Sequence, residues 1–444
     1  MDVSRIRRRA TVLTGAAVLV SLSAAACSNS SSSGTANSSS GTANSVGGGV
    51  GQASSGSAAP GVTGNSVTVG LLTSLTGPTA AGFTTVSTGF QARVDQQNAE
   101  GGVGGRKIKV VLGDDQGTTA GALSAAQTLV EQKNVFATGM ISITGFAAAP
   151  YLTRQNVPVT GTPLDGPEWA PPNNNMFPTS GSPSPKFPAP STYGTFFKAQ
   201  GATNIAAVAY NTPTAAAGAQ NVRSSAEAAG LKSTYINSTI PLTQEGGFGS
   251  IVQQMKQEHV DGIYIEMQPT ANFALLEAMQ QAGMNVKAYL MDISPPAAIF
   301  QNQAAAAAAQ GTWVPSHWVP VALQTPAVKS FQAALLKYAH QTTPPDENEY
   351  DGWAAADLII KGLQQAGTNP TRESFEKGLR AVTDYNAGGL LVSPANMTES
   401  FGTGAEGPGP YSENCYYYSQ YKGSDWVPDT KPICGPLIPN SNAG

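Results

Sequence analysis

The chain has 444 residues and few charges: 24 Lys and Arg stand against 28 Asp and Glu, the charged fraction is 12%, and the formal net charge is −4. A mildly acidic chain without a basic stripe argues against nucleic acid as a partner. The low charged fraction favours a large buried core, and residues 66–439 are numerous enough for two domains of ordinary size.

Residues 1–26 predict a secretory signal peptide. Four Arg precede an apolar run from Ala10 to Leu22, and three alanines then lead directly to Cys27. The apolar run is too short for a spanning helix, and small residues before a break are typical of a cleavage site. The cysteine after the alanines resembles the bacterial lipobox, although Ala24 stands where Leu is most frequent. We therefore expect a lipid on Cys27 that anchors the exported protein to the outer face of the cell membrane; a plainly secreted chain with an incidental cysteine is the alternative.

Residues 27–65 predict a disordered tether. Ser28 to Gly61 is almost entirely Ser, Gly, Ala, Asn and Thr, with no charged and no aromatic residue. Such a segment cannot bury enough apolar surface to offset its chain entropy. As a flexible coil it would have an r.m.s. reach of roughly 33 Å.

From Val67 the sequence alternates between short β-branched runs and longer helical stretches. The runs predict strands at residues 67–72, 107–112, 135–139 and 157–160, and the stretches between them predict helices at 80–98, 120–132 and 146–155. Gly101 to Gly105 follows the first helix, where glycine permits the positive φ of a helix end and a sharp turn. A dinucleotide-binding glycine motif would instead follow a strand and open a helix.

The same alternation begins again after a Pro-rich interruption at residues 163–190. Strands are expected at 205–210, 234–240, 262–267 and 287–291, and helices at 215–229, 248–258, 271–281, 328–340 and 353–365. Strand, helix and strand at this spacing make a mostly parallel sheet that is covered by helices on both faces. The sequence therefore predicts two α/β units in tandem.

Two cysteines remain near the C-terminus, Cys415 and Cys434. The residues between them read as two strands joined by a turn at 422–425, which would let the sulfur atoms meet. Exported proteins meet oxidising conditions, so we expect a disulfide. A metal site is the alternative, but two cysteines without a nearby histidine cannot complete a tetrahedral set of ligands.

Several segments carry a family resemblance. Residues 67–78 (VTVGLLTSLTGP), 98–108 (NAEGGVGGRKI) with 114–116 (DDQ), 125–130 (AAQTLV), 156–159 (NVPV) and 350–355 (YDGWAA) resemble the branched-chain amino-acid-binding proteins of ABC importers. The resemblance implies a two-lobed type I periplasmic-binding-protein fold with a ligand cleft between the lobes. It also implies a monomer without cofactor or metal that binds a small molecule and delivers it to a membrane permease.

With that fold, we expect residues 66–190 plus about 320–388 to form the first lobe and 191–319 plus about 389–439 to form the second. Ligands of open α/β sheets bind at the carboxyl ends of the strands. In the first lobe these ends carry hydroxyl groups, at Thr76, Thr79, Ser142, Thr144 and Thr162. Ser142 to Thr144 resembles the place where the family holds a ligand carboxylate, and helix capping is the alternative role for these hydroxyls.

In the second lobe the strand ends carry a mixed set of candidates: Tyr210, Thr214, Glu266, Gln268 and Asp292. Glu266 and Asp292 could pair with an ammonium group, since a buried charge needs compensation. Tyr210 could stack on a ligand or belong to the core. Trp318 lies at an expected hinge crossing, where it could line the cleft or rigidify the hinge. Alanines at residues 215–217 replace an aromatic residue of the family's amino-acid binders, which puts leucine-like ligands in doubt.

No motif predicts an enzyme. His259, His317 and His340 have no metal-ligand spacing, and no G-x-S-x-G motif is present. The acidic residues 346–351 lack the glycine of a calcium loop and would favour the start of a helix. We expect a solute-binding lipoprotein that captures a small carboxylate-bearing solute, in the first place an amino acid. The alternatives are a lipoprotein that presents its ligand to a membrane receptor, a structural lipoprotein of the cell envelope, and a binder of aromatic acids or amides.

Overall fold

The computed structural model describes residues 59–164, 167–169, 173–179, 188–295, 297–398, 413–438 and 441, all within the unit Ser57–Gly444. The expected signal peptide, Cys27 and nearly all of the expected tether lie outside the described residues. Within the described part, no helix combines the length and the apolar character needed to cross a membrane.

The first sheet has five parallel strands: β1 (Ser66–Thr73), β2 (Lys107–Asp114), β3 (Thr138–Ile141), β4 (Val159–Gly161) and β5 (Met176–Pro178). Their order is β2-β1-β3-β4-β5. Side chains alternate between the two faces of a strand. Accordingly Val67, Val69 and Leu71 join one buried cluster and Leu72 joins another.

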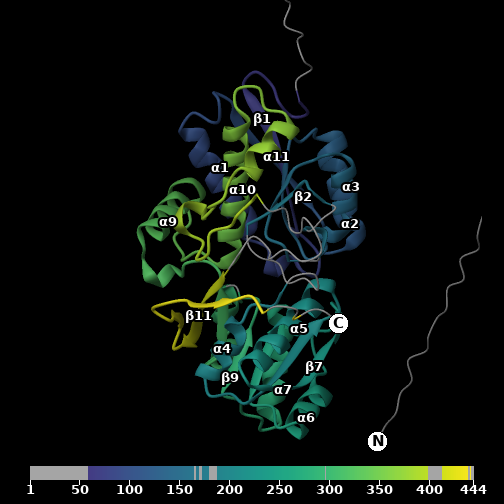
Figure 1. Cartoon of the computed structure of the whole chain (residues 1–444), viewed down its shortest axis with the longest axis vertical. Coiled ribbons are helices and arrows are strands. Elements are labelled where there is room, and N and C mark those ends of the chain that lie inside the picture. The colour runs from purple at the N-terminus through teal and green to yellow at the C-terminus, as the bar shows by residue number, and fades with distance from the viewer. Residues whose placement is uncertain are drawn as a thin grey trace, which may run out of the picture. The chain divides into compact units, whose positions relative to one another are not determined.

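Each face of this sheet has its own helices (Figure 1). The cluster that contains Val69 also contains residues of α1 (Val86–Ala99), α9 (Pro326–Ala339), α10 (Glu347–Ala366) and α11 (Arg372–Arg380). The cluster that contains Leu72 is covered by α2 (Thr119–Gln127) and α3 (Ala149–Arg154). Helices from residues 326–380 therefore return to the first sheet.

The second sheet has the order β12-β11-β10-β9-β8-β6-β7, with β13 paired to β11. Its strands are β6 (Asn204–Tyr210), β7 (Lys232–Ile240), β8 (Gly262–Glu266), β9 (Ala288–Met291), β10 (Trp313–Ser316), β11 (Glu413–Lys422), β12 (Asp425–Pro428) and β13 (Ile433–Pro436). The strands from β7 to β10 are parallel, and β11 is antiparallel to its neighbours. The helices of this half are α4 (Thr192–Ala199), α5 (Pro213–Ala228), α6 (Gly249–Gln257), α7 (Pro269–Gln281) and α8 (Gln303–Ala308).

Short helical turns complete the described elements: η1 (Ala80–Gly82), η2 (Thr128–Gln132), η3 (Gly145–Ala147), η4 (Pro167–Trp169), η5 (Ala297–Gln301), η6 (Val321–Leu323) and η7 (Ala387–Gly389). The glycine turn after α1 has the expected geometry, with φ of +81° at Gly102. A side chain there would also meet the backbone, because a Cβ atom would lie 1.9 Å from the carbonyl oxygen of Arg106.

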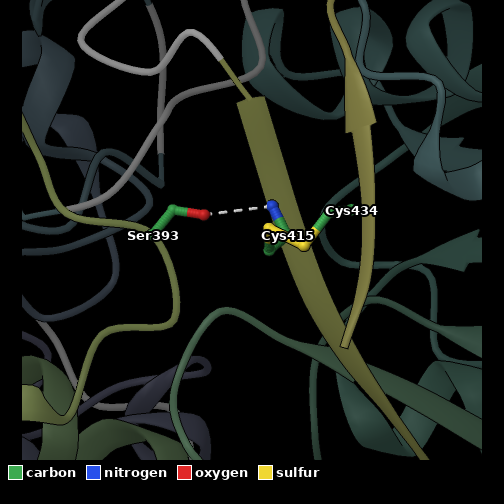
Figure 2. Close-up of a disulfide and its surroundings, with 3 residues drawn as sticks. All are labelled: Ser393, Cys415 and Cys434. Atoms are coloured by element: carbon green, nitrogen blue, oxygen red, sulfur yellow. Dashed lines mark hydrogen bonds between the residues drawn. A yellow bond between two sulfur atoms is a disulfide. The ribbon is translucent and has the colours of Figure 1, made fainter. Parts of the chain in front are cut away.

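Cys415 and Cys434 form a disulfide, as the sequence predicts (Figure 2). They are directly opposite each other on β11 and β13. The bond therefore joins two neighbouring strands, with β12 in the loop between them. The backbone N–H of Cys415 also donates to the hydroxyl of Ser393, 3.1 Å away.

The predicted fold class is confirmed, but the predicted start of the first helix, at residue 80, is wrong. The first helix begins at Val86, after the separate turn η1. Leu390 and Leu391 are buried in the same cluster as residues of α9 and α10. Leu391 makes one isolated bridge, to Trp318. The exact boundaries of the two lobes stay a prediction.

Candidate functional site

The hydroxyl groups expected in the first lobe surround a buried carboxylate, that of Asp115. Ser74 donates to Asp115 Oδ1 over 2.6 Å, and Ser142 donates to Oδ2. Thr79 donates to Ser74 over 2.9 Å, and Thr144 lies 3.2 Å from the Ser142 hydroxyl. Three of the predicted residues are thus brought together, but around an acid of the protein itself.

Thr76 lies apart from this network. It is exposed, and its hydroxyl donates to Asp114 Oδ2 over 2.5 Å. The backbone N–H groups of Leu75, Thr76 and Gln116 also donate to Asp114, and these bonds hold the pKa of its carboxyl below the usual value. Asp114 thereby fixes the loop that follows β1.

Two more of the predicted residues, Thr162 and Trp318, donate hydrogen bonds to a second acid, Asp351. Thr162 donates to Asp351 Oδ1 over 2.7 Å, and the indole N–H of Trp318 donates to the same oxygen over 3.2 Å. Trp318 is only 1% exposed and stacks on Tyr350, with ring centroids 5.6 Å apart. This burial favours the hinge-stiffening role for Trp318 over a role in lining the cleft.

Asp351 lies in the first two turns of α10. Two other acidic residues, Asp346 and Glu349, cap the start of this helix. Asp346 accepts from the N–H of Glu349, and the Glu349 side chain accepts from the N–H of Asp346 over 2.7 Å, which makes a capping box. The acidic residues therefore do lie at a helix start, as expected, but the helix begins at Glu347 and not at the predicted residue 353. Glu347 and Asp351 are spaced four apart and therefore share another face of the helix.

The imidazole of His317 lies near both Glu347 and Asp351. Its Nδ1 is 3.9 Å from Glu347 Oε1, and its Nε2 is 3.9 Å from Asp351 Oδ1. Both distances are too long for a hydrogen bond. Burial lowers the pKa of His317 to about 4. The imidazole is therefore neutral at pH 7 and supplies no positive charge.

In the second lobe, Glu266 and Asp292 lie beside a pair of tyrosines. Tyr264 donates to Glu266 Oε2 over 2.9 Å, and the Tyr193 hydroxyl is 3.5 Å from Asp292 Oδ1. The rings of Tyr193 and Tyr264 pack edge to face, with centroids 5.5 Å apart. Glu266 is 7% exposed. The two carboxylates that the sequence singled out thus belong to one polar cluster.

These acids have raised pKa values. Burial, together with the charge of Asp292, holds the pKa of Glu266 well above its usual value. Burial raises the pKa of Asp292 to about 6 and that of Asp351 to about 7. Burial raises the pKa of Glu347 too, and the charges of Asp351 and Asp292 raise it further. In the described part of the chain, no Lys or Arg forms an ion pair with any of the four.

The remaining three candidates are at the carboxyl ends of β6 and β8. The Tyr210 hydroxyl accepts from the N–H of Gln268 over 3.2 Å, and Tyr210 is 4% exposed, so this side chain belongs to the core. The Gln268 side chain reaches across to η1, where a Cβ on Gly82 would lie 2.6 Å from Gln268 Oε1. Thr214 is 3% exposed, and its hydroxyl has no hydrogen-bond partner.

The prediction from sequence missed Asp351, Glu347, Tyr193 and Tyr264 as members of this region. The i, i+4 spacing of Glu347 and Asp351 indicates that their side chains share one face of a helix. From the sequence alone, both residues are assigned only to the start of that helix. The two tyrosines gave no signal, because aromatic residues are ordinary in strands and helices of a core. Among the described residues, no group of three or more His, Cys, Asp or Glu side chains could hold a metal ion.

A family model described as periplasmic binding protein matches residues 66–423, which is most of the chain. The Leu/Ile/Val-binding protein BraC3 of Rhizobium johnstonii is 38% identical over 76 residues, which cover 17% of this chain and 21% of BraC3. The Leu/Ile/Val-binding protein homolog 3 of Brucella melitensis is 22% identical over 341 residues, 74% of this chain and 89% of that protein.

Solved structures share the fold. A solute-binding protein of an ABC transporter from R. palustris, in complex with 4-hydroxybenzoate, has a TM-score of 0.68 and 17% identity over 85% of this chain and 98% of that chain. The family consists of extracytoplasmic binding proteins, so the prediction of a binding protein rather than an enzyme is confirmed. The fold and the match over residues 66–423 together show that the chain is a member of the periplasmic binding protein family.

Proposed function

We propose that the protein is an exported lipoprotein, anchored through Cys27, which captures a small amine-bearing solute and delivers it to an ABC-type importer. The relatives supply the transport part of this proposal, since the R. palustris protein belongs to an ABC transporter and the Brucella protein is named for amino-acid binding. The lipobox-like cysteine supplies the anchor. An amino acid is the first solute to consider.

One observation carries the choice of solute: Glu266 and Asp292 lie together without a cation among the described residues. A desolvated carboxylate is costly unless a positive charge or hydrogen bonds compensate it. The ammonium group of a solute would supply that charge. The proposed site therefore recognises an amine first.

The carboxylate end of the expected amino acid has less support. Thr76, Thr79, Ser142 and Thr162 all donate their hydroxyl protons to oxygen atoms of the protein. The N–H of Thr144 also points at the protein, donating to Ser142 over 3.1 Å. A ligand carboxylate would have to displace these bonds and approach the charge of Asp115. Aromatic acids are accordingly less favoured than amines.

The variant Asp292→Asn tests the proposal. Removing this charge leaves a bound ammonium without its partner, and we expect affinity for an amine to fall by about 2 kcal/mol or more. The measurement is the shift in melting temperature with added amino acids, where a ligand at 100 times its Kd stabilises by about 2.7 kcal/mol.

The matched control is Asp384→Asn, which removes the same charge from an exposed position outside the cluster. It should respond to ligand as the unaltered protein does. Equal ligand-induced stabilisation of the Asp292→Asn variant and the control would exclude Asp292 from the site.

A further inference from the structure

Four carboxylates from three parts of the chain face one region of the molecule. Glu266 ends β8, Asp292 follows β9, and Glu347 with Asp351 lies on one face of α10. We refer to Glu266 and Asp292 as the sheet pair and to Glu347 and Asp351 as the helix pair. Each pair holds two acids, which is more than a single ammonium group requires.

The two pairs are close enough to act on each other. The charge of Asp292 is among the causes that raise the pKa of Glu347. Asp292 follows β9 and His317 follows β10, and these two strands are parallel neighbours with Trp313 opposite Leu290. His317 is 3.9 Å from both acids of the helix pair. Both pairs therefore border the same space.

The groups that face the helix pair do not neutralise it. His317 is 3.9 Å from both Glu347 and Asp351, and its Nε2 is buried without a hydrogen-bond partner. Thr162 and Trp318 bond to a single oxygen, Asp351 Oδ1. No ammonium or guanidinium group of the described residues reaches either acid.

An independent observation marks the sheet pair as incomplete. A Cβ atom on Gly218 of α5 would lie 2.0 Å from Glu266 Oε2, so this face of α5 is directed at Glu266. Thr214 is one turn earlier on the same face, and helical side chains lean toward the N-terminus. Its hydroxyl is buried, with 3% of the residue exposed, and has no partner. A buried hydroxyl without a partner is destabilising, and a ligand nitrogen would satisfy it.

We propose that the solute carries two positively charged nitrogens, one bound by Glu266 and Asp292 beside the Thr214 hydroxyl and the other by Glu347 and Asp351. Basic amino acids and aliphatic diamines have this chemistry. The inference rests on the proposed solute-binding function and names its ligand class. A neutral amino acid would satisfy only one of the two pairs.

The test compares solutes that differ by one amine. L-Ornithine and L-norvaline share their carbon skeleton, and only ornithine has a second, terminal amine. Isothermal titration calorimetry at pH 8, on full-length protein dialysed free of carried-over solute, should give ornithine an affinity at least about tenfold above that of norvaline. 1,4-Diaminobutane should likewise bind more tightly than butylamine.

The variant Glu347→Gln locates the second nitrogen. It should weaken ornithine at least about tenfold while norvaline changes by less than about twofold. The matched control Glu258→Gln alters an exposed acid at the end of α6 and should change neither. A folded Glu347→Gln protein is confirmed by its melting temperature without ligand.

Two results would overturn the inference and leave solute binding intact: equal affinity for ornithine and norvaline, or unaltered ornithine binding in Glu347→Gln. Tight binding of 4-hydroxybenzoate with no binding of either amino acid would do the same and would also remove the amine from the proposed function. A protein that binds none of the amines, acids, amides or sugars supplied would contradict both proposals.

Discussion

At the scale of single residues, the main feature is a set of acids whose pKa values are raised. Asp292 is raised to about 6 and Asp351 to about 7, chiefly by burial, and Glu349 and Glu376 are raised to about 7. Such groups hold their protons more strongly in the folded state than in the unfolded state. Stability without ligand must therefore depend on pH near neutrality.

We predict that the ligand-free protein loses stability as the pH rises from about 4 to about 7. In this window the unfolded chain has released protons from these acids that the folded chain still holds, so the free energy of unfolding falls with rising pH. The lowered pKa of His317 acts in the opposite direction, but it is one group against the four acids. Binding of an amine should show the opposite trend, because ionised carboxylates attract it. Urea unfolding at pH 5 and pH 8, with and without ornithine, measures both. A ligand-free protein that is more stable at pH 8 than at pH 5 would contradict the assignment.

Part of this site could be read from the sequence. Glu266 and Asp292 follow buried strands, so the strand-end rule predicts them directly. Glu347 and Asp351 could not be separated from Asp346 and Glu349, which do cap α10. Their role depends on His317, Thr162 and Trp318, which come from distant parts of the chain and which only the tertiary structure brings near. The same holds for the Ser142 hydroxyl, whose proton goes to Asp115.

At the scale of elements, α1 and α10 make the closest helix contact of the first core. A Cβ atom on Gly89 of α1 would lie 2.0 Å from the carbonyl oxygen of Glu349, and one on Gly352 of α10 would lie 2.0 Å from that of Val86. Both glycines thus allow the backbones to touch. The position of α10, and with it the helix pair, depends on this contact.

We predict that Gly89→Ala destabilises the protein by about 2 kcal/mol, although alanine favours a helix more than glycine does. The added methyl group would push α10 away from α1. Gly249→Ala is the control, since a Cβ atom there meets nothing within 4 Å. It should be neutral or slightly stabilising in urea unfolding. If both variants unfold at the same urea concentration, the contact between the two helices is looser than described.

Most helices and strands were predicted from strong periodic patterns of apolar residues. Elements with weak patterns were missed for physical reasons. The runs at residues 67–72 and 262–267 are buried on both faces and became β1 and β8. By contrast, β5 has three residues and α4 follows a Pro-rich stretch, so neither gives a clear period. The disulfide was predictable because only two cysteines remained after Cys27.

At the scale of the whole molecule, the proposed attachment to the membrane would depend on Cys27, which lies outside the described residues. Acyl chains on Cys27 would supply the attachment. We predict that Cys27→Ser moves the protein from the membrane fraction to the soluble fraction or the medium. Fractionation followed by immunoblotting measures this. Unchanged partitioning of the variant would show that Cys27 is not the lipidated residue.

The acids at the ends of β8 and β9 and on α10 support one central claim, that the protein binds a solute through its amine. Calorimetric titration at pH 8 with L-ornithine, L-norvaline and pentanoate tests this claim most directly, because pentanoate keeps the carbon skeleton and the carboxylate but has no amine. We predict saturable binding of ornithine, weaker binding of norvaline and no binding of pentanoate. Pentanoate binding as tightly as ornithine would contradict the claim.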